Sequence, residues 1–74
     1  MGQTKIVVCE DVMKGLEAVR LSGKTNMLDA PMVAHLALEM GFSETAFWID
    51  ENRSLYAQGV FMGFQVEIDQ ERRW

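Results

Sequence analysis

Apolar side chains recur three and four positions apart in the first third of the chain. This stripe consists of Val12, Met13, Leu16 and Val19, with charged residues between them. The spacing places the apolar positions on one face of an α-helix. It predicts a helix over about residues 10–22. Gly23 is expected to end this helix, because glycine readily adopts the left-handed conformation found at helix ends.

A second stripe predicts a helix over about residues 30–40. Its members are Met32, Val33, Leu36, Ala37 and Met40. Asp29 can cap the first turn, and Pro31 is tolerated there because its missing N–H would have no partner. Gly41 is expected in the left-handed position after the helix, with Phe42 folded back on the last turn.

A third, broader apolar set predicts a helix over about residues 44–62, with Ser43 as its N-cap. The set comprises Ala46, Phe47, Trp48, Ile49, Leu55, Tyr56, Val60 and Phe61. A polar run at residues 50–54 interrupts it, and Gly63 is the expected stop. The apolar face is wider than one helical stripe. Part of it is therefore expected to contact a partner or a second copy.

The two ends of the chain carry strand-like patterns. Residues 64–68 alternate between apolar and polar side chains, and residues 6–8 are a β-branched run. These segments can pair as a minimal two-stranded ribbon or remain irregular, and residues 69–74 are expected to form a mobile tail. The predicted fold class is all-α, a compact three-helix domain, and residues 1–74 are expected to form this single domain.

Size limits how this domain can be stabilised. With 74 residues and 8.4 kDa, folding hides only roughly 60–65% of the surface that the unfolded chain exposes. Cys9 is the only cysteine, so a disulfide could form only with another chain. An apolar content of 49% in so short a chain favours self-association. A homodimer is therefore expected.

The charge pattern disfavours nucleic acids as partners. The net charge is −4 and the isoelectric point is near 4.8. The seven basic residues are scattered, whereas a nucleic-acid surface normally clusters them on one face. No segment approaches the ~18 uninterrupted apolar residues of a membrane span. A cytoplasmic protein is expected.

One stretch of the chain matches a loose nucleotide-binding pattern. Ala18 to Thr25 fits four residues between Ala and Gly-Lys-Thr. A phosphate-binding loop follows a strand and opens a helix. Here a helical pattern precedes Gly23, and no helix starts directly after Thr25. The stretch is therefore interpreted as a connection between two helices.

No catalytic, cofactor or metal site is expected. His35 and Glu39 lie four residues apart, but no third ligand or nucleophile stands near them in the sequence. Asp50 and Glu51 are adjacent, so on a helix their side chains point about 100° apart and make a poor acid–base pair.

Several short segments together carry a family likeness. They are Ala18 to Asp29, Val33, Met40-Gly41-Phe42, Asp50 to Arg53, and Tyr56. Over about residues 8–64 the chain resembles a family of small uncharacterised phage and prophage proteins with a Ser-Gly-x-Thr-Asn-Met-x-Asp core. The resemblance implies a phage or prophage source and no defined activity. The residues expected to shape the turns are Gly23, Asn26, Asp29, Gly41 and Phe42.

The leading functional hypothesis is a non-enzymatic phage accessory protein that binds a host or phage protein and inhibits a defence or metabolic enzyme. The side chains expected to contact the partner are Trp48, Tyr56, Phe61, Phe64 and Arg53. For Trp48 and Tyr56 the alternative is an ordinary core position. Two other functions stay open: a small nucleic-acid-associated regulator, and a small-ligand sponge with its pocket at a dimer seam.

Overall fold

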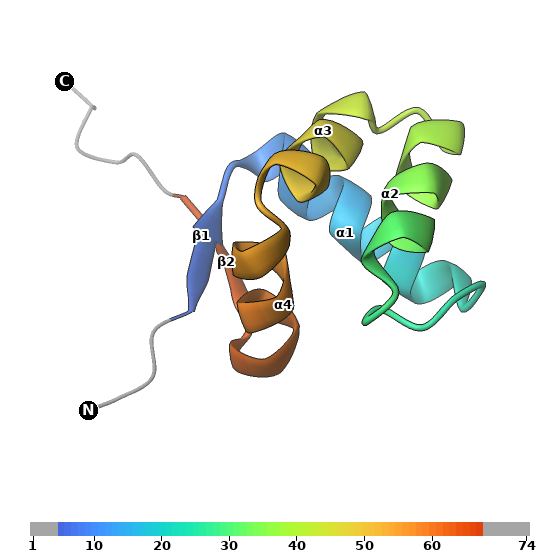
Figure 1. The fold of residues 1–74 in the computed structure, drawn as a ribbon. Helices are drawn as coiled ribbons and strands as arrows, with labels where there is room; N and C mark the ends of the chain where they lie inside the picture. Colours follow the sequence, from blue (N-terminus) through green and yellow to red (C-terminus); the bar gives the residue numbers. More distant parts are fainter. Residues whose placement is uncertain (1–4, 68–74) are drawn as a thin grey trace, which may run out of the picture.

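Four helices and two short strands make up the computed structural model, which describes residues 5–67 (Figure 1). In chain order they are β1 (Ile6–Val8), α1 (Glu10–Ser22), α2 (Ala30–Glu39), α3 (Ser43–Glu51), α4 (Arg53–Met62) and β2 (Phe64–Val66). The strands lie on one flank of the molecule, and α2 lies on the opposite flank. The tail predicted over residues 69–74 is outside the described residues.

The connection between α1 and α2 confirms its predicted turn residues. Gly23 has a φ of 66°, and its N–H donates to the carbonyl of Arg20 at 3.3 Å. The Asn26 side chain accepts from the N–H of Leu28 at 2.8 Å, which folds the middle of the connection into a turn. Asp29 then caps α2 by accepting from the N–H of Met32 at 3.4 Å.

The end of α2 is a Schellman motif, as predicted from Gly41 and Phe42. Gly41 has a φ of 92° and donates its N–H to the Leu38 carbonyl at 3.1 Å. Phe42 donates to the Ala37 carbonyl at 2.8 Å, and its ring packs against the core. The prediction of Ser43 as N-cap was wrong. Ser43 is the first residue of α3, because Phe42 occupies the cap position and makes no side-chain cap bond.

The single helix predicted over residues 44–62 is two helices, because the chain breaks at Asn52. Asn52 has φ −135° and ψ 50°, outside the helical region. Its side-chain amide donates to the Trp48 carbonyl at 3.0 Å, and its own carbonyl accepts the N–H of Tyr56 at 2.8 Å. The backbone N–H of Asn52 donates to the same Trp48 carbonyl at 2.9 Å, so this carbonyl accepts two hydrogen bonds at the end of α3. The break lets α4 turn away from α3 and lie against the strands.

The terminal segments pair, and they pair in parallel. Ile6 lies opposite Phe64, Val7 opposite Gln65 and Val8 opposite Val66. Ile6 donates its N–H to the Gly63 carbonyl at 3.0 Å, and Glu67 donates to the Val8 carbonyl at 2.8 Å. All four helices lie between the two strands in the chain. Because the strands are parallel, the chain enters β1 at one end of the sheet and leaves β2 at the other (Figure 1). The domain is therefore mostly helical with a small sheet, rather than all-α.

The core lies between the helices and the inner face of the sheet. Its buried members are Val8, Val12, Leu16, Val19, Val33, Ala34, Ala37, Ala46, Ile49 and Tyr56. Helices α1 and α3 approach closely where a Cβ on Gly15 would lie 2.0 Å from Oγ1 of Thr45. The fully buried Thr45 hydroxyl donates back to α1, to the Val12 carbonyl at 3.1 Å. A glycine and a small hydroxyl residue thus fix the spacing of these two helices.

A second close approach joins α4 to β2. A Cβ built on Gly59 would lie 2.2 Å from the Phe64 ring, and Gly59 itself is buried. The ring therefore lies directly on the backbone of α4. Gly63 between the two elements has a φ of 105°, which lets the chain reverse and bring Phe64 back over Gly59.

We expect Gly59→Ala to destabilise the fold by about 1–3 kcal/mol, because the new methyl group displaces the Phe64 ring. Helix propensity alone would give the opposite sign, a gain of roughly 1 kcal/mol. Urea unfolding followed by circular dichroism measures the difference. Gln58→Ala, on the exposed side of the same helix, should change stability little. A Gly59→Ala protein as stable as the wild type would show that Phe64 moves aside without cost.

Candidate protein-binding surface

Three of the side chains predicted to bind a partner pack together: Trp48 and Phe64 are partly buried, and Tyr56 is buried. The Trp48 and Phe64 rings lie edge to face, with centroids 6.2 Å apart and planes at 77°. The Tyr56 and Phe64 centroids are 5.9 Å apart. We call Trp48, Tyr56 and Phe64 the aromatic cluster; it joins α3, α4 and β2. Tyr56 is 1% exposed, so in this structure it is a core residue and has no surface to offer a partner.

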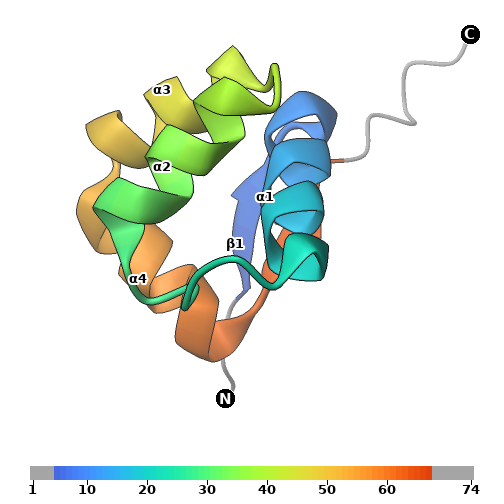
Figure 2. The same ribbon diagram turned by 90° about the vertical axis from the view of Figure 1, so that its right-hand side faces the viewer.

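The hydroxyl of Tyr56 reaches across the core to the connection between α1 and α2. It donates a hydrogen bond to the backbone carbonyl of Met27. Figure 2 shows this connection crossing in front of α4. Burial, together with the negative charge of Asp29, raises the pKa of Tyr56 to about 12. The proton therefore stays on the hydroxyl at ordinary pH and holds the connection on α4.

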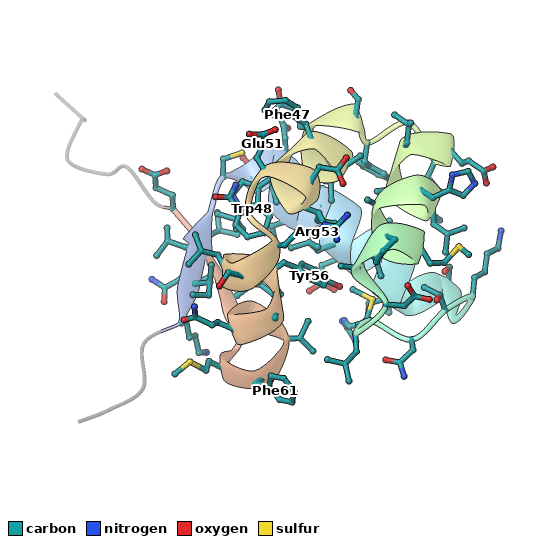
Figure 3. The ribbon with its side chains drawn as sticks, in the orientation of Figure 1. Phe47, Trp48, Glu51, Arg53, Tyr56 and Phe61 are labelled. Atoms are coloured by element: carbon teal, nitrogen blue, oxygen red, sulfur yellow. The ribbon has the colours of Figure 1, made fainter. Side chains whose placement is uncertain are left out.

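Two other aromatic side chains are strongly exposed. Phe61 on α4 is 76% exposed and Phe47 on α3 is 68% exposed. Figure 3 places them at opposite ends of the helical layer, with Phe47 at the outer edge of α3 and Phe61 at the far end of α4. Arg53 is also exposed and lies 3.6 Å from a carboxylate oxygen of Asp50. Of the five predicted partner-binding residues, Phe61 and Arg53 are therefore the ones with substantial free surface.

Phe47 is an exposed aromatic residue that the sequence reasoning did not single out. Ala46 and Ile49 face the core from α3, and Phe47 is out of phase with them by most of a half-turn. Three acidic residues share its side of the helix: Glu44 three positions before it, and Asp50 and Glu51 three and four positions after it. The broad apolar face of a continuous helix concealed this pattern. With α3 taken alone, the periodicity would have placed Phe47 outside.

Comparison with known proteins identifies a family. Residues 8–63 match the model of a domain of unknown function, DUF5049. The chain belongs to this family. The matched range is nearly the same as residues 8–64, over which the sequence resembles a family of small proteins. No curated protein and no solved structure matches this DUF5049 chain.

One cleft of the DUF5049 domain is small and mostly apolar. It holds about 210 Å³ and lies between α1, α4, β2 and the Met27 connection. Glu17 and Arg20 stand at this cleft and pair with each other at 2.7 Å. Pockets for drug-sized ligands usually measure about 300–1,000 Å³. The cleft thus offers little room and no unpaired charge for a small polar ligand.

Other candidate chemistry in the DUF5049 domain is sparse. Within residues 5–67, no three His, Cys, Asp or Glu side chains gather closely enough to hold a metal ion. His35 and Glu39 lie 3.2 Å apart on the exposed side of α2. Lys24 and Thr25 follow the end of α1 rather than a strand, so they lack the frame of a phosphate-binding loop. None of the helices over these residues is long and apolar enough to cross a membrane.

Alkaline pH should destabilise the DUF5049 domain through Tyr56. The unfolded chain releases the Tyr56 proton near pH 10, whereas the folded chain holds it to about pH 12. The stabilisation is complete below about pH 10 and falls by about 2–3 kcal/mol as the pH rises toward 12. Denaturant unfolding across this range measures the loss. Tyr56→Phe should be less stable than the wild type at neutral pH by about 1 kcal/mol. Its free energy of unfolding should fall less than that of the wild type as the pH rises from about 10 to about 12. An equal loss of stability in both proteins would contradict the assignment of the alkaline destabilisation to Tyr56.

Proposed function

We propose that this chain is a non-enzymatic accessory protein, encoded by a phage or prophage, that binds a host protein in the host cytoplasm and inhibits it. The observation that carries the binding role is the exposure of Phe47 and Phe61 on a domain of 8.4 kDa. Large aromatic side chains supply much of the binding energy at protein interfaces when a partner covers them. The two rings lie at opposite ends of the helical layer, so each offers a separate apolar anchor to a partner.

The proposal assigns no enzymatic role to this chain, and the surroundings of its titratable side chains support that choice. The pKa of Tyr56 is shifted, but its hydroxyl is buried and bonded to a backbone carbonyl. The His35–Glu39 pair is exposed, and His35 shares an open cleft of about 240 Å³ with Asp50 and Arg53, which pair with each other. A catalytic site normally gathers several titratable groups in a cleft. Here the shifted group is structural, and the other titratable groups form exposed ion pairs.

The phage origin in this proposal rests on sequence. The Ser22–Asp29 core and the Met40-Gly41-Phe42 turn resemble those of small phage and prophage proteins. A small protein with exposed aromatic anchors suits inhibition by direct binding. An acidic surface disfavours the nucleic-acid alternative, and α4 offers Arg53 as its only cation.

Capture from host lysate tests the proposal. Tagged wild-type protein should retain a specific host protein, identified by mass spectrometry. A double variant, Phe47→Ser with Phe61→Ser, should lose it, because both aromatic anchors are gone. Leu21→Ser is the matched control, since Leu21 is 73% exposed on α1. The control should retain the partner. Recovery of no protein by the wild type, or equal recovery by all three proteins, would overturn the proposal.

We also propose that α4 supports a homodimer at higher concentration. Leu55, Phe61 and Met62 are exposed apolar side chains on this one helix. A two-fold axis beside α4 would bring each set against its copy, the commonest arrangement for a small homodimer.

Sedimentation equilibrium at micromolar concentration checks the dimer. The wild type should show an increasing mass with concentration, and Phe61→Asp should remain monomeric and folded because its residue lies outside the core. Trp48→Asp should instead unfold the protein, since Trp48 packs on Phe64. A folded wild-type monomer at every concentration would contradict the dimer.

A further inference from the structure

The outer side of α3 combines one exposed ring with several carboxylates. Phe47 points away from the core, with Glu44 one turn before it and Glu51 one turn after it. Figure 3 shows Phe47 and Glu51 together at the outer edge of this helix. We call Phe47, Glu44 and Glu51 the acidic aromatic surface. Asp50 borders it on the other side of the ring.

The charges of this surface are incompletely neutralised by the described chain. Arg53 lies 3.6 Å from Asp50. No cation among residues 5–67 forms a salt bridge with Glu44 or Glu51. Lys14 lines a cleft of about 200 Å³ together with Glu44 and Asp11, so this one cation faces two carboxylates and forms a salt bridge with neither. The surface thus keeps a negative potential around an apolar ring.

We propose that the acidic aromatic surface binds a basic protein segment, in which a lysine or arginine stem covers the Phe47 ring while its cation lies between Glu44 and Glu51. This inference rests on the proposed protein-binding function and names the chemistry of the partner. Long basic side chains bury their apolar stems and keep the charged group near carboxylates. The face of a phenylalanine ring also attracts a cation. One side chain therefore satisfies both features of the surface.

Charge selects this occupant over the others. A second copy placed on the same surface by a two-fold axis would bring its own Glu44 and Glu51 against the first pair, and each chain already carries a net charge of −4. Like charges opposed in this way repel. Phosphate backbones would be repelled for the same reason. A basic protein segment is attracted from a distance and guided to the ring.

Selection from a displayed library of random 12-residue peptides, about the length of an average helix, provides the test. Peptides enriched on the wild type should carry a net positive charge. Their affinity for a Glu44→Gln, Glu51→Gln double variant should fall about tenfold, the effect of losing two exposed charge contacts. Phe47→Ala should weaken them similarly. The matched control is Glu17→Gln with Glu39→Gln, which removes the same charge elsewhere and should leave affinity unchanged. Circular dichroism confirms that each variant is folded.

The outcomes separate this inference from the proposed function. Basic peptides that bind the Glu44/Glu51 variant and the control equally would show attraction by net charge alone and would overturn the inference. Enriched peptides that are neutral or acidic, and that depend on Phe61, would overturn it while preserving a protein-binding role. Enrichment of no peptide at all would count against both. Loss of affinity confined to the Phe47 and Glu44/Glu51 variants supports it.

Discussion

The hydrogen bond from Tyr56 to Met27 joins parts of the chain that lie far apart in the sequence. Tyr56 lies on α4, and Met27 lies in the connection between α1 and α2. The same ring packs on Phe64 of β2. Because the hydroxyl is buried, losing its partner would leave a polar group unsatisfied inside the core. One side chain thus fixes the connection, the last helix and the sheet relative to one another.

This arrangement depends on the break at Asn52. A continuous helix from α3 into α4 would carry Tyr56 away from the connection and could not place Gly59 beneath Phe64. With the break, α3 packs on α1 and α2, and α4 packs on the strands (Figure 1). Two glycines then allow the close contacts: Gly15 against Thr45 and Gly59 against Phe64. Backbone approaches of this kind let a short chain form a closed core with small residues.

The aromatic side chains of α3, α4 and β2 form two groups with different surroundings. Trp48, Tyr56 and Phe64 turn inward and stabilise the fold. Phe47 and Phe61 remain outside, on different helices and far from each other (Figure 3). The proposed binding function therefore draws on side chains that lie outside the core.

The sequence by itself determined where α1 and α2 lie and which turns follow them, because the signals for these elements are local. The apolar stripes, the Asp29 cap and the glycines at positions 23 and 41 act within a few residues, so their effect can be predicted without the rest of the fold. The sequence left the pairing of the terminal segments open, and the tertiary structure decided both that they pair and that they pair in parallel. Only the tertiary structure decided where α3 ends and which aromatic rings are buried. Those outcomes depend on contacts between distant segments, such as Tyr56 with Met27, and no local periodicity records them.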